Sequence, residues 1–396
     1  MQSFFDPSRW CRNDEFWSWQ IWGWLMNQNR SRRFQILSLS GGGYRGLHIA
    51  HLLEIVEDKI GGRIAQHFDL IAGTSIGGII GLALALEIPA VDIRKTLEEV
   101  GPKLFPTPPP TFPSIQKIFK EKGLVAQLYY AWKHKSALES DLYDAKSAWY
   151  NNSALAEALG AQNYFGSRQI GDLLHPIIVP TVNFSNGNPK FYKTDHHKDF
   201  TFDRNLSILD VALGTSAAPI YFPVHKINDL RIVDGGLIAN DPTQVAVHEA
   251  MKFFGVRPPL FGDTSTGSDD LQVLSIGTLA PKHFADTSRS LNQGILDWGT
   301  GVFDLAGSAQ EAMAAFMIDK HMLPGKVIRL PSLEARPEKA PGMAEVNEQV
   351  NETLRASAQT LAQSAFGSVQ FKALFDHRGQ TLADVRAQFC RGDANA

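Results

Sequence analysis

A serine between two glycines is the first feature of this sequence that could do chemistry. Ser75 lies in residues 73–77, which read Gly-Thr-Ser-Ile-Gly, between an apolar strand candidate and the apolar run 79–86. That order predicts a strand, a sharp turn and a buried helix; such a turn lifts the serine hydroxyl off the end of a sheet, just ahead of a helix N-terminus. Gly73 and Gly77 suit the turn because a side chain at either place would crowd it. The pattern favours a nucleophile over a serine in an ordinary turn.

Three consecutive glycines could supply the second requirement of acyl transfer. Residues 41–46 read Gly-Gly-Gly-Tyr-Arg-Gly and follow an apolar strand candidate. Acyl transfer needs N–H donors aimed at the charge that develops on the substrate carbonyl, and one donor is typically worth about 2.7–4 kcal/mol of barrier. The N–H groups of Gly41, Gly42 and Gly43 could turn into one cavity, which side chains would block. Arg45 would either add positive field there or brace the loop against a carboxylate.

The same glycine run also fits the GxGxxG fingerprint of dinucleotide-binding folds. In such folds the second strand is followed by an acidic residue that holds a ribose. Here the second predicted strand ends in the Gly-Thr-Ser of residues 73–75 instead. Acyl transfer is therefore the preferred interpretation.

The base that would activate the serine is less certain from the residues alone. Asp234 ends an apolar strand candidate and precedes two glycines. Serine hydrolases of the α/β type use a serine, an acid and a histidine in that chain order. The histidines after Asp234 are His248, His283, His321 and His377, and none stands in a glycine-rich turn at a strand end. His248 has the spacing of an ordinary helix histidine, so the residues alone do not identify the base.

Periodicity places these motifs at the ends of predicted strands. Residues 34–39 form the first strand, and apolar residues recur at helical spacing over 49–60 behind the glycine run. A strand, loop, helix, strand, turn and helix in succession predict an α/β fold, with a parallel sheet and helices on its faces.

Further elements follow along the chain. We expect a helix over 90–104, a rigid proline-rich connection over 106–113 and a helical insertion over 114–165. Two strands lie around the Asn186-Gly187 turn, and a helix starts at Asp241. Residues 271–276 are expected to be the last strand of the central sheet, followed by a long helix with an apolar face over 295–316, a strand candidate at 327–328 and mostly helical structure beyond.

Three motifs in this order resemble the patatin-like phospholipase family: residues 41–46, residues 73–77 and the Asp-Gly-Gly of residues 234–236. The Thr-Ser-Ala-Ala-Pro of residues 215–219 adds to the likeness, which covers roughly residues 34–280. The resemblance implies a three-layer α/β/α hydrolase with a mostly parallel central sheet, plus the helical insertion and C-terminal helices. It also implies that the substrates are phospholipids, from which fatty acids are released.

The resemblance assigns roles to individual residues. It implies that Ser75 is the nucleophile and Asp234 its base, in a Ser–Asp dyad. Such a dyad demands a short, water-poor hydrogen bond, because an ordinary aspartate is a weak base. The oxyanion hole would be the backbone of Gly41, Gly42 and Gly43. The supporting residues would be Arg45, Gly73, Gly77, Gly235 and Gly236.

A closer likeness is to the patatin-like effectors of bacterial anti-phage (CBASS) signalling, which a cyclic di- or trinucleotide switches on. It is carried by the phrases at residues 194–197, 203–206 and 210–213. It implies a cyclic nucleotide activator, for which Lys282, Arg289 and Trp298 are candidate contacts. The alternatives are a lipase that needs no nucleotide and a binding module without catalysis; the presence of all three motifs argues against the second.

The chain is organised into three regions in this interpretation. Residues 1–33 form a tryptophan-rich segment suited either to a membrane interface or to packing on the domain or a second subunit. Residues 34–280 form the hydrolase core, and residues 281–396 form a mostly helical region packed on it, expected to be regulatory.

Composition narrows the possible partners and the cellular compartment of the protein. The chain has 396 residues, a formal net charge of -3 and two cysteines near its opposite ends, which indicates no nucleic-acid-binding surface and no disulfide framework. No apolar run approaches the roughly 20 residues that span a bilayer. We therefore expect a cytoplasmic protein. Together with the resemblance, this leads us to expect that it acts at the inner face of the cell membrane, as a homodimer or higher homo-oligomer, with no metal or other cofactor.

Overall fold

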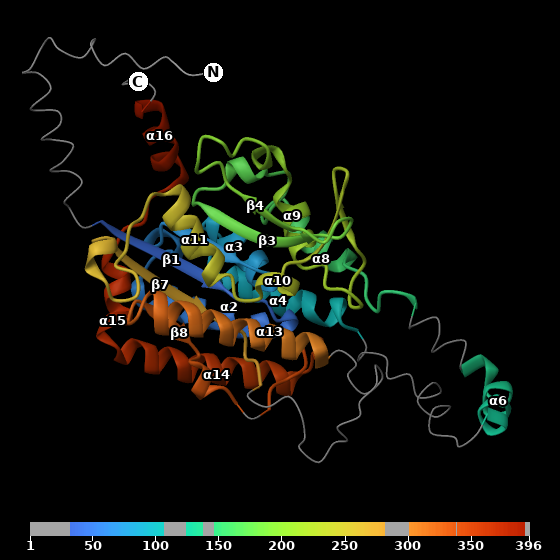
Figure 1. Cartoon of the computed structure of the whole chain (residues 1–396). Coiled ribbons are helices and arrows are strands. Elements are labelled where there is room, and N and C mark those ends of the chain that lie inside the picture. Colours follow the sequence, from blue (N-terminus) through green and yellow to red (C-terminus); the bar gives the residue numbers. More distant parts are fainter. Residues whose placement is uncertain (1–31, 107–123, 138–145, 282–300, 338, 393–396) are drawn as a thin grey trace, which may run out of the picture.

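One mixed sheet runs through the part of the chain that the computed structural model describes, residues 32–106, 124–137, 146–281, 301–337 and 339–392 (Figure 1). It is eight-stranded in the order β5-β6-β3-β2-β1-β7-β8, and β4 pairs with β3. The strands are β1 (Arg33–Leu39), β2 (Leu70–Gly73), β3 (Ile177–Asn183), β4 (Pro189–Lys193), β5 (His225–Ile227), β6 (Leu230–Asp234), β7 (Asp270–Ile276) and β8 (Val327–Leu330).

The centre of the sheet is parallel, as the strand–helix succession predicted. β1 pairs in parallel with β2 and β7, β2 pairs in parallel with β3, and β7 with β8. β4, β5 and β6 join antiparallel at one side. Parallel strands point their carboxyl ends to one edge, so the ends of β1 and β2 lie together there, where ligands of open α/β sheets bind.

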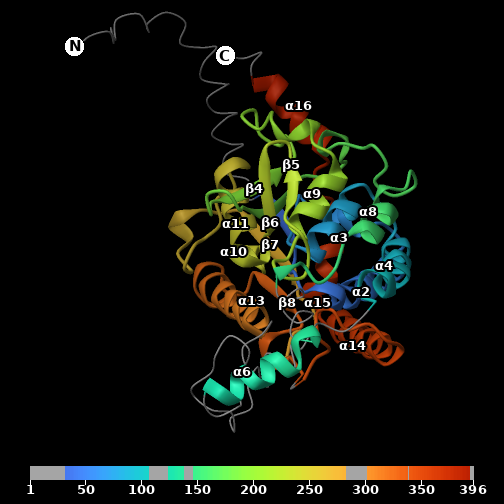
Figure 2. The same ribbon diagram turned by 90° about the vertical axis from the view of Figure 1, so that its right-hand side faces the viewer.

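Helices cover both faces of the sheet (Figures 1 and 2). They are α2 (Gly46–Ile60), α3 (Ile76–Ala85), α4 (Ala90–Leu104), α6 (Leu124–Lys133), α8 (Ser153–Gly160), α9 (Ile208–Thr215), α10 (Gly236–Ala239), α11 (Thr243–Phe253), α13 (Gly301–Ala314), α14 (Glu348–Gly367), α15 (Val369–Lys372) and α16 (Leu382–Gly392). α13 continues as a π-helical segment, η7 (Ala315–Met322). Short 3-10 turns span Gly43–Arg45, Ile64–His67, Ile170–Asp172, Asp203–Asn205, Thr264–Thr266, Leu333–Ala335 and Ala373–Asp376.

The alternation of β1 divides the core into two layers. Leu37 and Leu39 pack with apolar residues of α2, α3, α4, α9 and α14 on one face. Phe34 and Ile36 pack with residues of α11 and η7 on the other face. Successive side chains of a strand point to opposite faces, and both faces here are covered, so β1 is buried from Phe34 to Leu39. The three-layer α/β/α prediction is confirmed.

The C-terminal region contributes to both the sheet and its cover. β8 extends the sheet beyond β7, so the prediction that residues 271–276 form its last strand is wrong. α14 packs along α2, with Val350, Leu354 and Ala358 in the main core. A strand of four residues such as β8 carries too little local pattern to place it at an edge before its neighbours are known.

Other predicted elements are present with small shifts of their ends. The helix over 90–104 is α4, the paired strands are β3 and β4, and the helix after Asp241 is α11. The insertion 114–165 contains the helices α6 and α8 in its described parts, and α8 packs on α4. The tryptophans of residues 1–31 lie outside the described residues.

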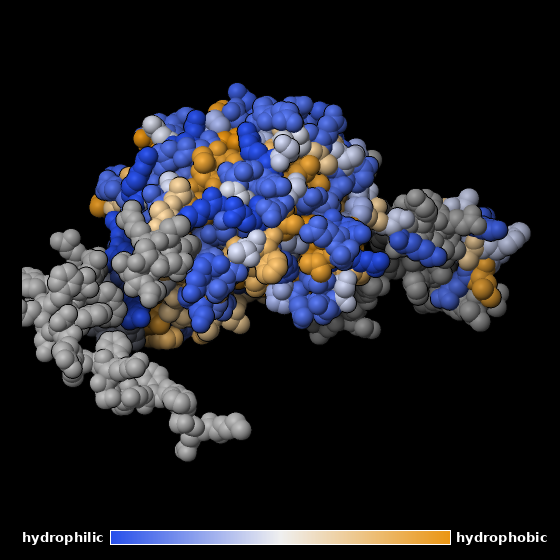
Figure 3. Space-filling model, turned by 90° about the horizontal axis from the view of Figure 1, so that it is seen from above, coloured by the Kyte–Doolittle hydropathy of each residue, from blue (hydrophilic) through white to orange (hydrophobic). Residues whose placement is uncertain are grey.

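Surface hydropathy and helix length bear on how the protein could meet a membrane. Seen from above, the molecule is largely hydrophilic, with hydrophobic side chains gathered in a few patches (Figure 3). Within the described ranges, none of the helices is long and apolar enough to cross a membrane.

Candidate active site

The turn between β2 and α3 holds Ser75 in an unusual conformation. Its backbone has φ 56° and ψ −126°, a conformation that residues other than glycine rarely adopt. A Cβ at Gly73 would lie 2.2 Å from the carbonyl oxygen of Gly77, and one at Gly77 would lie 2.3 Å from that of Leu39. The prediction that side chains would crowd this turn is confirmed. The Ser75 N–H donates to Thr215 Oγ1 at 3.0 Å, which helps to hold the turn.

Asp234, at the end of β6, meets the serine. Ser75 Oγ donates to Asp234 Oδ2 at 2.6 Å, and both side chains are buried. The N–H of Gly236 donates to Asp234 Oδ1 at 2.6 Å, so the other carboxylate oxygen is held too. Gly235 lets the end of β6 lie close against β3, because a Cβ there would lie 2.1 Å from the Pro180 carbonyl oxygen. Gly236 thus hydrogen-bonds to the Asp234 carboxylate, and Gly235 packs against the neighbouring strand.

Burial sets the electrostatics of this carboxylate. Desolvation raises the pKa of Asp234 from 3.8 to about 6, although the hydrogen bonds from Ser75 and Gly236 act in the opposite direction. An aspartate with this pKa is a better proton acceptor near neutral pH than an ordinary one.

The glycine loop lies against the same site, but its three members differ. Gly42 and Gly43 line a cavity together with Ser75 and Asp234. Gly43 has φ 60°, and a Cβ there would lie 2.5 Å from the Met343 carbonyl oxygen. The N–H of Gly41, in contrast, donates to the carbonyl oxygen of Asn240 at 3.0 Å. The expectation that Gly41 offers its N–H to a substrate is therefore corrected, because that donor is already occupied.

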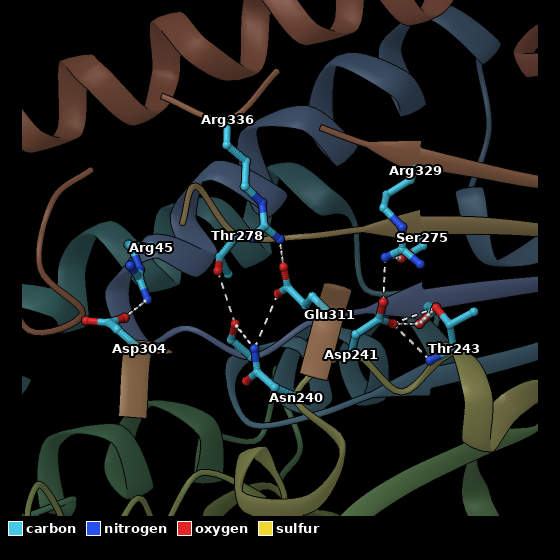
Figure 4. Close-up of polar contacts among 12 residues, drawn as sticks. Arg45, Asn240, Asp241, Thr243, Ser275, Thr278, Asp304, Glu311, Arg329 and Arg336 are labelled. Atoms are coloured by element: carbon cyan, nitrogen blue, oxygen red, sulfur yellow. Dashed lines mark hydrogen bonds and ion pairs between the residues drawn. The ribbon is translucent and has the colours of Figure 1, made fainter. Parts of the chain in front are cut away.

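Arg45 braces this loop. Its Nε donates to the Gly42 carbonyl oxygen at 3.3 Å. Its Nη2 donates to Asp304 Oδ1 of α13 at 2.6 Å (Figure 4). The guanidinium is buried and does not line the cavity. Of the two roles considered for Arg45, bracing against a carboxylate is the one that the contacts support.

Asn240 forms a second brace that sequence reasoning missed (Figure 4). Its carbonyl oxygen accepts from Gly41, and its Nδ2 donates to Glu311 Oε1 of α13 at 3.3 Å. Glu311 also pairs with Arg336. The hydroxyl of Thr278 donates to the Gly41 carbonyl oxygen at 3.1 Å. These partners are far apart in the sequence and belong to no local motif, so no signal in the chain pointed to them.

The cavity beside Ser75 has a volume of about 150 Å³ and is lined mostly by apolar side chains. They come from α3, α4 and the residue after it, α8, α10 and α13, from the loop around Tyr221 and from Met343 ahead of α14. The apolar residues are Ile76, Ile79, Leu97, Val100, Leu104, Phe105, Leu155, Ala218, Pro219, Tyr221, Phe222, Leu237, Phe303, Ala306 and Met343. Such a lining fits a hydrocarbon chain attached to the bond that reacts.

Histidines do not line this cavity within the described part of the chain. His248 and His321 are exposed, and His377 pairs with Asp69 at 2.8 Å on another part of the molecule. His283 lies outside the described residues, as do the candidate nucleotide contacts Lys282, Arg289 and Trp298. Nor do three or more His, Cys, Asp or Glu side chains converge as metal ligands anywhere in the described ranges.

Comparison with known proteins agrees with this geometry. The model of the patatin-like phospholipase family matches residues 37–247, which include both Ser75 and Asp234. A "cGAMP-activated phospholipase" of Pseudomonas aeruginosa is 36% identical over 72% of this chain and 74% of its own length. Proteins of the same name from Vibrio cholerae and Escherichia coli are 31% identical (76% of this chain, 82% of theirs) and 33% identical (62% and 62%). The chain belongs to the patatin-like phospholipase family.

Proposed function

We propose that this protein is a serine lipid acyl hydrolase that releases fatty acids from membrane phospholipids, with Ser75 as nucleophile and Asp234 as its base. The observation that carries the proposal is the 2.6 Å hydrogen bond from Ser75 Oγ to Asp234 Oδ2 beside an apolar cavity. The absence of any histidine from the lining of that cavity, among the described residues, favours a two-residue mechanism over a triad.

In the first step Ser75 Oγ attacks the ester carbonyl carbon while its proton passes to Asp234 Oδ2. The N–H groups of Gly42 and Gly43 face the charge that develops on the carbonyl oxygen, and the N-terminus of α3 behind Ser75 adds favourable field. The proton on Asp234 then goes to the leaving alcohol oxygen as the ester bond breaks. This leaves a fatty acyl group on Ser75.

In the second step water takes the place of the alcohol. Asp234, ionised again, accepts a proton from the water as its oxygen attacks the acyl carbon. The ester bond to Ser75 breaks, the serine recovers its proton and the fatty acid leaves. Burial of Asp234 helps here, because the raised pKa keeps the carboxylate basic enough to accept a proton in both steps.

An activator is the second part of the proposal. Three relatives carry the name "cGAMP-activated phospholipase". We therefore propose that a cyclic di- or trinucleotide, with cGAMP as the first candidate, switches the hydrolase on in anti-phage defence at the inner face of the membrane, where it acts as a homo-oligomer. A switch fits the chemistry, since a constantly active phospholipase would damage its own cell.

The test is release of fatty acid from phospholipid vesicles, with and without each member of a panel of cyclic di- and trinucleotides. The wild-type chain should release fatty acid strongly only with its activator, whereas Ser75→Ala and Asp234→Asn should lose at least about 10³-fold of that rate. Ser216 lines the same cavity, but its hydroxyl donates to the Ala212 carbonyl oxygen of helix α9 at 2.8 Å. Ser216→Ala is therefore the matched control and should keep most activity.

Three results would contradict parts of the proposal separately. An indispensable histidine, tested by His248→Ala, His283→Ala, His321→Ala and His377→Ala with the fold intact, would replace the dyad. Full activity without nucleotide would remove the switch and leave a constitutive lipase. Retained hydrolysis by Ser75→Ala would remove the nucleophile.

A further inference from the structure

The helix α13 has its polar side turned inward. Asp304 pairs with Arg45, and Glu311 accepts from Asn240 and pairs with Arg336 (Figure 4). Gln310 accepts from the N–H of Asn240 at 2.7 Å and donates to the Gly236 carbonyl oxygen at 3.0 Å. The polar residues of an ordinary surface helix face solvent. Here they hold the loops around the site instead.

The outward side of α13 and η7 is apolar. The sequence predicted one apolar face for this helix, and the structure turns part of that face to solvent: Val302 is 43% exposed, Leu305 39% and Phe316 53%. Met313, at 57%, and Met317, at 36%, belong to the same side. Leu237 and Ile238 of α10, a helix that α13 contacts, are 41% and 38% exposed. We call these seven side chains the α10–α13 face.

This face is continuous with the cavity beside Ser75. Leu237 lines that cavity and is also part of the face. Phe303 and Ala306 line the cavity from α13, and their sequence neighbours Val302 and Leu305 point to solvent. Apolar side chains therefore extend from this face to the lining of the cavity.

We propose that the α10–α13 face docks on the surface of a phospholipid bilayer and delivers the acyl chain to the cavity. This inference rests on the proposed function, whose substrate it places at a defined surface of the molecule. A helix with one apolar side lies in the plane of the interface with that side buried among headgroups and acyl chains. From residue 302 to residue 317 such a helix reaches about 22 Å, at 1.5 Å per residue.

The charges around the face agree with a bilayer that contains anionic lipid. The acidic side chains of α13, Asp304 and Glu311, are paired on its inner side. The exposed charged residue that follows the face is cationic, Lys320. A cation at the edge of an inserted helix is attracted to anionic headgroups. A protein bound across the same face would cover Leu237, which lines the cavity, whereas a lipid surface there presents the substrate itself.

The experiment separates docking from catalysis by using the full chain with Ser75→Ala, which should bind lipid without hydrolysing it. Its partition onto vesicles of phosphatidylethanolamine and phosphatidylglycerol is measured by co-sedimentation, with and without cGAMP. Adding Met313→Gln and Phe316→Gln should reduce the partition about tenfold or more, because two apolar side chains that would insert into the bilayer are replaced by polar ones. The same pair in an otherwise wild-type chain should leave hydrolysis of a dispersed short-chain ester unchanged, since neither residue lines the cavity.

The matched control replaces two exposed hydrophobic side chains elsewhere, Phe202→Gln with Val369→Gln, which are 89% and 79% exposed. It should keep the full partition. Docking is overturned if the chain with Met313→Gln and Phe316→Gln binds vesicles as well as the Ser75→Ala chain without them. It is also overturned if the two substitutions dissociate an oligomer, because a second copy of the chain then covers the face. Hydrolysis of the short-chain ester by Ser75→Ala would defeat the proposed function alone, because the partition experiment does not depend on catalysis.

Discussion

Asp234 is a buried carboxylate, and in the proposed mechanism its protonation state controls whether Ser75 can be activated. Burial raises the pKa of Asp234 to about 6, while the two hydrogen bonds it accepts favour the ionised form. The base must be ionised before it can accept the serine proton, so the fraction of competent protein rises with pH through this value.

This balance predicts the pH profile. We expect kcat/KM for a dispersed short-chain ester to rise from about pH 4.5, reach half of its maximum near pH 6 and stay level up to about pH 8, because kcat/KM reports the pKa of the free protein's base. The uncharged ester contributes no titration of its own. A half-maximum near pH 4, or a flat profile, would show that a carboxylate with a raised pKa does not limit the rate.

At the scale of elements, α13 determines where the glycine loop lies. Asp304 holds Arg45, and Arg45 in turn holds the Gly42 carbonyl oxygen. The N–H groups of Gly42 and Gly43, proposed as oxyanion donors, therefore depend on a helix whose Asp304 is 259 residues from Arg45 in the sequence. Oxyanion donors act only when they are held in position before the reaction begins.

Removing the negative charge of Asp304 should therefore slow catalysis. For Asp304→Asn we expect kcat to fall about tenfold with KM changed less than about threefold, since a misplaced donor weakens the transition state more than substrate binding. Asp304→Glu should recover part of kcat because it restores the charge. Glu334→Gln, an exposed acid in the same C-terminal region, is the control and should behave like wild type. An equal loss in Asp304→Glu and Asp304→Asn, together with a lowered melting temperature, would indicate a purely structural role.

At the scale of the whole molecule, the C-terminal region is built into the fold. β8 extends the sheet, and α14 covers α2 with His48 buried between them, where its Nδ1 contacts the Leu354 carbonyl oxygen at 3.3 Å. Desolvation lowers the pKa of His48 from 6.5 to about 4. The folded protein thus keeps this imidazole neutral at pH values where the unfolded chain binds a proton.

That difference predicts acid lability. Between about pH 6.5 and pH 4 the unfolded state gains a proton at His48 that the folded state does not, so stability falls as pH falls through this window. From pH 7 to pH 5 the loss that His48 contributes is about 2 kcal/mol. Urea unfolding at the two pH values should show this loss in the wild-type chain and a correspondingly smaller one in His48→Gln. His248→Gln, exposed on α11, should keep the wild-type pH dependence; an unchanged pH dependence in His48→Gln would contradict the prediction.

The sequence by itself determined the parts of this protein that depend on neighbours along the chain. The apolar run of β1, the helical spacing behind the glycine run and the glycines around Ser75 are local, because turns and periodic faces are set within a few residues. They sufficed to predict the parallel sheet and the strained turn, whereas the pairing of Ser75 with Asp234 was implied only by the family resemblance.

Only the tertiary structure decided what those elements meet. Periodicity showed that the helix around Val302 and Phe316 has an apolar side, yet nothing in it tells whether that side faces a core, a membrane or solvent. The occupation of the Gly41 N–H by Asn240, the pairing of Arg45 with Asp304 and the place of β8 beyond β7 join residues far apart in the chain. Such contacts depend on how all the elements pack at once, and no local pattern of residue types records them.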